Sequence, residues 1–285
     1  MLELPYHEPL LRMYFAATLP ARKLDASRRA AEGKCPAMVL FYHRVADVHP
    51  NAWTISRRRF REQINWIRDR FSICSLVEAQ RRIASGDNRE PIVSLTFDDG
   101  YAENCDDALP WLTAEKIPFT YFVATRHMLA GLPFAHDLQA GRPLAPNTPD
   151  QIRALADDGA EIGAHTRTHA DLGAVADPVR LVDEMLGSRD DLEQLIGRPV
   201  NYFAFPTGMP ANLSSAAFRL AFDARFWGVC SAYGGYNFPG DDAFHVQRIH
   251  GDPGWGRFRN WLTGDPAKLR RQRAFDPGDY RRPAP

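Results

Sequence analysis

The hydrophobic and polar residues of this chain alternate between short apolar runs and longer amphipathic segments. Short apolar runs rich in Val, Ile, Phe and Tyr are typical of buried strands. They occupy residues 38–42, 71–75, 92–97, 119–123, 160–164, 202–205, 227–230 and 244–249. Apolar residues at helical spacing predict helices in the segments between them. These helices are expected at residues 57–70, 75–85, 104–116, 148–159, 177–197 and 214–222.

The alternation of strands and helices predicts a parallel sheet covered by helices. Because about seven to eight strands fall in a chain of 285 residues, we expect a single α/β domain. A distorted (β/α) barrel is the favoured form of this domain, and an open sheet is the alternative. The expected barrel covers residues 37–265, after an N-terminal helical extension over residues 1–36. A basic, proline-containing tail over residues 266–285 follows, and we expect it to be solvated.

Two helix starts carry a capping signal, in which a Ser or Thr is followed three residues later by Glu or Gln. Ser75 with Glu78 marks one start, and Thr148 with Gln151 marks the other. Residues 126–147 are rich in Gly and Pro and show no periodicity, so they predict a long loop of the kind that often carries function.

The charge balance excludes one class of function. Lys and Arg number 35 and Asp and Glu number 35, so the net charge is zero. Such a chain has no overall attraction for nucleic acid or for an anionic membrane. We therefore expect no nucleic-acid partner, and the basic tail alone does not change this expectation.

The cysteines and the N-terminal segment bear on the compartment. The four cysteines are too scattered to suggest a disulfide framework or a metal-binding pair, so we expect reduced thiols. The sequence carries no recognisable secretory signal and no apolar run long enough to span a membrane, which favours the cytoplasm. Residues 1–36 could form an amphipathic helix on a membrane surface, but packing against the barrel is the favoured interpretation.

The main chemical signal is a pair of adjacent carboxylates, Asp98 and Asp99, directly after the strand at residues 92–97. Two neighbouring carboxylates disfavour joint ionisation unless a cation or a shared proton lies nearby. A metal ion meets this need, and the carboxylate that does not bind it remains available as a base. An Asp-Asp-Gly turn without chemistry is the alternative.

Other polar residues also follow predicted strands. His165 and His169 follow one strand, His43 follows another, and Pro-Thr-Gly at residues 206–208 follows a third. Because the carboxyl ends of parallel strands share one face of a barrel, we expect these groups to converge. Two histidines four residues apart with one carboxylate form a ligand set that suits zinc, iron or another divalent ion. His43 alone could be a structural histidine or a group that titrates near neutrality.

Two of these motifs resemble those of the polysaccharide deacetylases, carbohydrate esterase family 4. Residues 96–100 read Thr-Phe-Asp-Asp-Gly and residues 165–169 read His-Thr-Arg-Thr-His, in the order and at the separation of that family. The resemblance extends over roughly residues 38–250. It implies a distorted barrel, a divalent ion held by Asp99, His165 and His169, and Asp98 as the general base. The ion is expected to be Zn2+, with Co2+, Ni2+ or Fe2+ as alternatives.

The third motif departs from the family pattern. Residues 204–207 read Ala-Phe-Pro-Thr, so Ala204 stands where the family has the arginine that orients the catalytic aspartate. Arg248 on the last strand is our candidate substitute. The backbone N–H of Thr207 remains suited to an oxyanion donor, because that role needs no particular side chain.

The general acid has two candidates. Residues 42–45, Tyr-His-Arg-Val, resemble the segment that supplies the catalytic acid in the branch acting on poly-N-acetylglucosamine. That resemblance favours His43. The family's usual late motif is Leu-x-His, and residues 248–250, Arg-Ile-His, match it poorly, so His250 is the alternative.

The resemblance implies an enzyme that removes N-acetyl groups from an amino-sugar polymer or oligomer, with an N-acetylated glycan as partner. A metal-dependent amidase acting on a non-carbohydrate amide is one alternative, and a carbohydrate-binding barrel with a degenerate site is another. Several aromatic residues could line a glycan groove or belong to the core. They are Trp53, Tyr101, Trp227, Tyr233, Tyr236 and Trp255.

Overall fold

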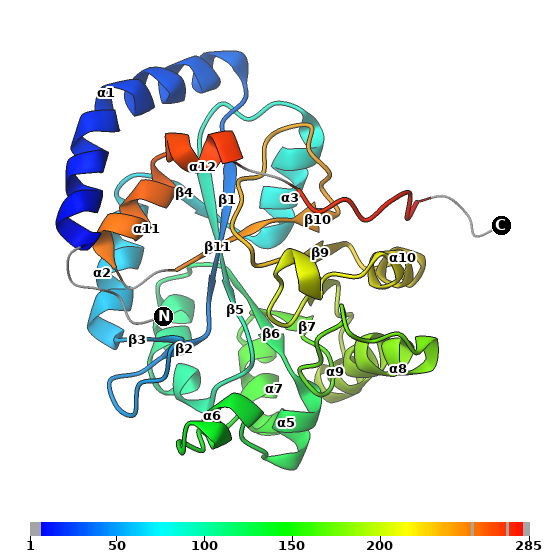
Figure 1. Ribbon diagram of the computed structural model, residues 1–285. Coiled ribbons are helices and arrows are strands. Elements are labelled where there is room, and N and C mark those ends of the chain that lie inside the picture. The colour runs from blue at the N-terminus through cyan, green and yellow to red at the C-terminus, as the bar shows by residue number, and fades with distance from the viewer. Residues whose placement is uncertain (1–6, 252–253, 272–273, 282–285) are drawn as a thin grey trace.

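Parallel strands form the centre of the molecule (Figure 1). The structure, a computed structural model, describes residues 7–251, 254–271 and 274–281. The strands follow one another in the order β10-β9-β8-β7-β6-β5-β1-β11. Their bounds are β1 (Ala37–Tyr42), β5 (Ile92–Phe97), β6 (Phe119–Val123), β7 (Glu161–Ala164), β8 (Tyr202–Ala204), β9 (Gly228–Cys230), β10 (His245–Val246) and β11 (Arg248–His250). β4 (Ser72–Cys74) pairs with the first half of β5, and β6 pairs with the second half.

The two ends of this strand order are joined through a single residue, Gln247. β10 pairs with β9, β11 pairs with β1, and only Gln247 separates β10 from β11. The side chain of Asn237 bonds the Gln247 backbone at both its N–H and its C=O, each at 2.8 Å. The sheet is therefore nearly closed, and the expected distorted barrel in a single domain is confirmed.

Helices cover the outside of the barrel (Figure 1). Before β7 they are α1 (His7–Glu32), α2 (Arg57–Arg68), α3 (Leu76–Ser85), η1 (Ala102–Asp106), α4 (Ala108–Ala114), α5 (Thr125–Ala130), α6 (Ala135–Gln139) and α7 (Pro149–Asp157). After β7 they are α8 (Pro178–Val182), η2 (Asp183–Gly187), α9 (Ser188–Ile196), η3 (Pro210–Asn212), α10 (Ser215–Asp223), α11 (Trp255–Leu262) and α12 (Pro266–Arg271). A two-stranded parallel sheet, β2 (Arg44–Val45) with β3 (Thr54–Ile55), lies beside the carboxyl end of β1.

The two capping signals have different outcomes. At α7, Thr148 and Gln151 form the complete reciprocal capping box, as predicted. At α3, Ser75 accepts a hydrogen bond from the Glu78 N–H, but the Glu78 carboxylate binds Arg81 and Arg82. The predicted capping box at α3 is therefore only half formed, because two arginines on the next turn compete for its carboxylate.

The N-terminal helix α1 packs along α11 (Figure 1). Arg22 on α1 is 4% exposed and donates hydrogen bonds to the backbone and the side chain of Asn260. A second contact joins Arg22 to the Thr263 hydroxyl at 3.1 Å. Among the described residues, no helix has both the length and the hydropathy required to cross a bilayer.

Two segments differ from the sequence-based expectation. Residues 126–147, predicted to be a loop, contain most of α5 and all of α6, two helices too short to leave a periodic pattern. In the expected solvated tail, α12 forms and Tyr280 is only 5% exposed, with its ring 5.3 Å from Phe244 and its hydroxyl on Asp242. Residues 272–273 and 282–285 of the tail, and 1–6 of the extension, lie outside the described residues.

Two predicted helices are divided. The helix expected at 104–116 is a 3-10 turn, η1, followed by α4. The helix expected at 177–197 begins as α8, passes through a π-helical turn, η2, and continues as α9. Its predicted stop at Gly197 is present, with a left-handed φ of 66°.

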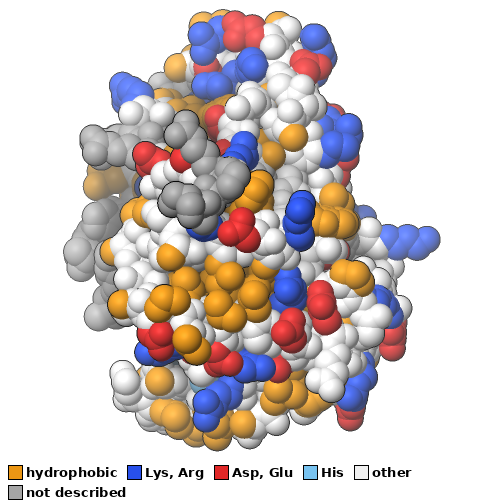
Figure 2. Space-filling view, turned by 90° about the vertical axis from the view of Figure 1, so that its right-hand side faces the viewer, with side chains coloured by type: hydrophobic (Ala, Val, Ile, Leu, Met, Phe, Trp, Pro, Cys, Tyr) orange, Lys and Arg blue, Asp and Glu red, His pale blue; other side chains and the backbone are white. Residues whose placement is uncertain are grey.

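Figure 2 shows the side of the molecule on which α8 and α10 lie. Hydrophobic side chains gather in the middle of this face, among Lys, Arg, Asp and Glu side chains. Exposed apolar residues on these two helices are Val179, Val182 and Phe222. The site described below contains none of them.

Candidate metal centre and active site

The side chains of Asp99, His165 and His169 converge beside the carboxyl ends of β5 and β7. One ligand atom from each lies within 4.8 Å of the other two. The Asp99 Oδ1 atom is 3.4 Å from His165 Nε2 and 3.1 Å from His169 Nε2. Asp99 Oδ1 is also buried without a hydrogen-bond donor among the described residues. A buried carboxylate oxygen facing two imidazole nitrogens is a donor set that fits a divalent cation.

A backbone carbonyl orients one of these histidines. The Nδ1 atom of His165 lies 2.8 Å from the carbonyl oxygen of Ala204. Since a carbonyl only accepts, Nδ1 carries the proton, and Nε2 keeps its lone pair toward Asp99. Metal-binding histidines commonly have such a partner on the nitrogen that does not bind the metal. Ala204 therefore contributes to the site through its backbone.

The local backbone is strained at four residues of the site. Left-handed φ values occur at Asp99 (74°), Thr166 (61°), His169 (57°) and Thr207 (61°). Such values are costly for residues with a Cβ atom and persist where the surroundings enforce them. Their concentration at the carboxyl ends of three strands indicates that the fold holds these residues in place against their own preference.

A buried glutamate on the π-helical turn η2 holds the segment between the two histidines. The Glu184 carboxylate accepts hydrogen bonds from the Thr168 N–H at 2.9 Å and from the Thr168 hydroxyl at 2.5 Å. Its backbone carbonyl accepts from the Arg167 N–H at 3.1 Å. Single π turns inside helices often occur at functional sites. Sequence reasoning did not identify Glu184, because nothing in the helical pattern marks the extra residue of a π turn.

Asp98 is paired with Arg248 inside the barrel. Nη1 and Nη2 of Arg248 donate to the two Asp98 oxygens at 2.6 and 2.8 Å. Arg248 is 0% exposed and also donates to the Thr96 hydroxyl and to the Ser231 carbonyl, each at 3.0 Å. Burial by itself raises the pKa of Asp98, but the Arg248 charge opposes it and the net pKa lies below the ordinary value. Asp98 is therefore an ionised carboxylate at neutral pH.

Arg248 and Ala204 lie on opposite sides of β5 in the strand order, Arg248 on β11 and Ala204 on β8. Ala204 is 0% exposed and belongs to an interior apolar group that includes Phe122. The Arg248 guanidinium lies 5.4 Å from the centre of the Phe122 ring. The small side chain of Ala204 is thus compatible with an arginine that enters the interior from β11 instead of from β8.

Both candidate acids lie next to each other, His43 after β1 and His250 at the end of β11. Their ring centres are 6.2 Å apart, and Trp53 contacts both rings. Burial lowers the pKa of His43, an effect that Asp99 and Asp98 oppose. Burial and the neighbouring His43 lower the pKa of His250 to about 3. The structure places the two histidines side by side and excludes neither as the general acid.

Thr207 follows β8, at the same end of the barrel as His165. The residue is exposed, and its N–H donates to no group in the described part of the chain. The φ of Thr207 is left-handed, so its backbone does not continue the β8 strand. The N–H is therefore available to a bound molecule.

Three comparisons relate the chain to known proteins. Residues 85–223 match the family model for polysaccharide deacetylases. The chain is 34% identical over 95 residues to the chitooligosaccharide deacetylase of Bradyrhizobium sp. (strain ANU 289), covering 33% of this chain and 35% of that protein. It is 24% identical over 172 residues to YxkH of Bacillus subtilis (strain 168), a proposed polysaccharide deacetylase, covering 60% of this chain and 56% of that protein. The chain thus spans about half or less of the length of these curated relatives.

Among solved structures, IcaB from Ammonifex degensii is similar, with a TM-score of 0.67 and 25% sequence identity. The match covers 81% of this chain and 98% of that chain. The family segment contains Asp98, Asp99, His165 and His169, whereas Arg248 lies beyond it. The matched segment, the similar relatives and the shared barrel agree with the resemblance found in the two sequence motifs. The chain is similar to the polysaccharide deacetylase family, whose model matches residues 85–223.

Proposed function

We propose that the protein is a metal-dependent hydrolase that removes N-acetyl groups from an amino-sugar polysaccharide or oligosaccharide. The observation that carries this proposal is the position of Asp98. This carboxylate lies next to the Asp99, His165 and His169 cluster, and Arg248 donates a hydrogen bond to each of its two oxygens. Names of relatives, including a chitooligosaccharide deacetylase, support the substrate class.

Asp99, His165 and His169 would hold the cation. We propose Zn2+, and Co2+, Ni2+ and Fe2+ are alternatives that suit two imidazoles and one carboxylate. When bound, such a cation supplies Lewis acidity toward an acetyl carbonyl and makes a nearby water more acidic.

The side chains around the cluster can carry out the proton transfers of hydrolysis. Asp98 accepts a proton from the attacking water, whose oxygen bonds to the acetyl carbon. The Thr207 N–H donates to the carbonyl oxygen as negative charge develops there. His43 donates a proton to the amide nitrogen as the carbon–nitrogen bond breaks. The products are acetate and the free amino sugar.

We assign the acid to His43 instead of His250. The strongly lowered pKa of His250, about 3, keeps its ring neutral near pH 7. Burial lowers the pKa of His43 as well, and Asp99 and Asp98 oppose that effect. The assignment to His43 therefore rests on its place after Tyr42, as in the Tyr-His segment, and beside these two aspartates. The Nδ1 atom of His43 is buried without a hydrogen-bond partner among the described residues, so no described contact fixes its tautomer.

The degenerate binding barrel is the weaker alternative. It rested on Ala204 and Thr207, where the third motif departs from the family pattern, and loss of the arginine at Ala204 would leave the aspartate without a partner. Arg248 occupies both oxygens of Asp98, so the site retains an oriented base. A binding module has no need for such a base beside a metal site.

Acetate release tests the proposal. Purified protein with added Zn2+ or Co2+ is incubated with N-acetylglucosamine oligomers and, separately, with a simple N-acetylated amine that lacks a sugar. We expect acetate from the oligomers alone, lost after chelation and restored by metal. Release from the simple amide only would favour an amidase, and no release from either with metal bound would favour a binding barrel.

A further inference from the structure

An exposed tryptophan borders the candidate acids. Trp53 is 43% exposed. The centre of its ring lies 4.7 Å from that of His43, with the planes tilted by 37°, and 5.7 Å from that of His250, nearly perpendicular to it. Unlike other exposed apolar residues of the surface, Trp53 lies directly against the two candidate acids, where an apolar ring can contact a bound molecule.

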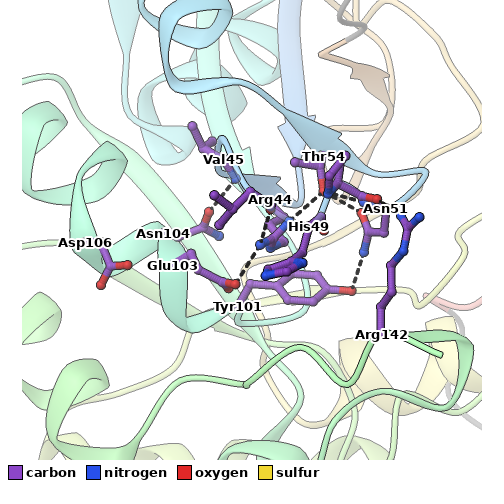
Figure 3. Close-up of polar contacts among 12 residues, drawn as sticks. Arg44, Val45, His49, Asn51, Thr54, Tyr101, Glu103, Asn104, Asp106 and Arg142 are labelled. Carbon is purple, nitrogen blue, oxygen red and sulfur yellow. Dashed lines mark hydrogen bonds and ion pairs between the residues drawn. The ribbon is translucent and has the colours of Figure 1, made fainter. Parts of the chain in front are cut away.

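The segment that carries Trp53 is anchored by a buried arginine. Arg44 is 0% exposed and lies directly after His43. Figure 3 shows its guanidinium among the polar groups of residues 46–54, here called the 46–54 loop. Its four hydrogen bonds go to the backbone oxygens of Val48 and His49 and to the side chains of Thr54 and Glu103, at 2.7–3.1 Å.

Asn51 forms hydrogen bonds both with residues of the 46–54 loop and with residues outside it. Its Oδ1 atom accepts from the Trp53 N–H at 3.0 Å and from the Thr54 hydroxyl at 2.7 Å. Its Nδ2 atom donates to Asp137 at 2.9 Å and to the Tyr101 hydroxyl at 3.3 Å. Figure 3 shows Asn51 turned toward Tyr101. The position of Trp53 is therefore set by side chains with fixed partners.

The contacts of Asn51 also connect the 46–54 loop to the metal cluster. The Tyr101 hydroxyl donates to the other oxygen of Asp137 at 2.8 Å. Asp137 lies on α6, and the residue before α6, Phe134, places its ring 5.5 Å from that of His169. The 46–54 loop and the His169 side of the cluster are thus connected through one buried carboxylate.

The chemistry around Trp53 indicates the class of ligand. An indole ring offers a flat apolar face and no charge, which suits the C–H face of a pyranose. Because the ring is already held in place, binding loses little conformational entropy. A sugar stacked there would lie next to His43, the group proposed to protonate the departing amine.

We propose that Trp53 is the sugar-binding platform of the site and that it stacks on the pyranose that carries the acetamide. This inference rests on the proposed function, and it adds the residue that selects a sugar over a simple acetyl compound. Trp53 contributes binding, whereas Asp98 and the metal cluster supply the chemistry.

Trp53→Ala and Trp53→Phe test the platform, with Trp227→Ala as the matched control. Trp227 is 51% exposed and directly precedes β9, at the opposite end of the barrel from the site. The substrates are an N-acetylglucosamine oligomer and 4-nitrophenyl acetate, which has no sugar ring. Thermal unfolding of each variant shows whether it is folded.

We expect Trp53→Ala to raise KM for the oligomer about tenfold, the loss of one good stacking contact. We expect kcat for the oligomer and the rate on 4-nitrophenyl acetate to stay within about threefold. Trp53→Phe should lie between the wild type and Trp53→Ala, and Trp227→Ala should match the wild type. An oligomer KM that does not change in Trp53→Ala overturns the proposal. An equal loss on both substrates also overturns it, since Trp53 would then act on the catalytic groups.

Calorimetric titration of the oligomer into Asp98→Asn, with and without Trp53→Ala, separates this inference from the proposed function. If the wild type releases no acetate but Asp98→Asn binds the oligomer in a Trp53-dependent way, the proposed activity fails and the platform stands. If Trp53→Ala leaves that affinity unchanged, or no binding occurs at all, the platform is wrong.

Discussion

Arg248 holds both carboxylate oxygens of Asp98, at 2.6 and 2.8 Å, although 150 positions separate the two residues. The contact exists because the barrel closes. β11 pairs with β1 and β1 pairs with β5, so an arginine on β11 reaches past one strand to the end of β5. The pair sets the charge and the orientation of the proposed base.

We predict that Arg248→Ala lowers kcat/KM by at least about a hundredfold. It also lowers the free energy of unfolding by about 3–5 kcal/mol, because the Asp98 charge stays buried without its partner. Arg248→Lys keeps the charge but loses the two-pronged geometry, so its activity should fall nearly as far while its stability falls less. Acetate release and urea unfolding give the two quantities.

Full activity in Arg248→Lys would show that only charge is needed at this position. A further variant tests the relation to Ala204. Adding Ala204→Arg to Arg248→Ala places an arginine where the family motif has one, and we expect partial recovery of activity. A wild-type rate in Arg248→Ala alone would contradict the role assigned to the pair.

We predict that His43→Gln reduces kcat by about 10²–10⁴-fold, the range for loss of a general acid. His250→Gln should reduce kcat less than tenfold, since its neighbour performs the transfer. The wild-type rate should depend on pH in a bell shape, and His43→Gln should lose the limb that falls at high pH. Reversed effects in the two variants would assign the acid to His250.

We predict that Glu184→Gln weakens metal binding about tenfold, because the amide can accept only one of the two hydrogen bonds from Thr168. Competition with a coloured chelator measures the affinity without any assay of activity. Asp190→Asn is the control, as Asp190 lies on the following helix with a side chain 67% exposed. Equal affinities in Glu184→Gln and the wild type would remove Glu184 from the support of the site.

We predict that acid weakens the fold through His245. This residue is 6% exposed, with Nε2 3.0 Å from the Ser231 hydroxyl, and burial lowers its pKa to about 4, an effect that Asp242 opposes. The unfolded chain has the ordinary pKa of 6.5 and binds a proton first. Stability is therefore complete above pH 6.5 and falls as the pH drops toward 4, by about 3 kcal/mol in total.

His245→Gln places an amide near the position of Nε2 and does not titrate. Its unfolding free energy should fall less than that of the wild type between pH 6.5 and 4.5, and the two should run in parallel above pH 7. Urea unfolding at each pH measures this difference. Parallel curves across the whole range would show that His245 does not cause the acid sensitivity.

Much of the fold follows from local sequence, because strand and helix periodicities are short-range properties. The sequence also predicted that Asp99, His165 and His169 would lie close together, because parallel strands place their carboxyl ends on one face of the barrel. Their roles as metal ligands remain a prediction. The family resemblance is confirmed, whereas kinship to the branch that supplies the acid from a Tyr-His segment stays a proposal.

What the sequence did not indicate depends on contacts between distant segments. Glu184 acts through a π turn, and the sequence of this segment carries no signal that marks the turn. Tyr280 is buried by packing against Phe244, and the composition of a basic tail hides that contact. Arg248 was a candidate only because Ala204 left a role open, and closure of the barrel through Gln247 explains how it reaches Asp98.

The most direct test of the account measures bound metal and acetate release side by side for the wild type, Asp98→Asn and Asp99→Asn. The two variants remove the same charge from neighbouring residues. We predict that Asp98→Asn keeps stoichiometric metal and loses at least about a thousandfold in rate, whereas Asp99→Asn loses both metal and activity. An active Asp98→Asn, or an Asp99→Asn that binds metal as tightly as the wild type, would contradict the division of base and ligand between these two carboxylates.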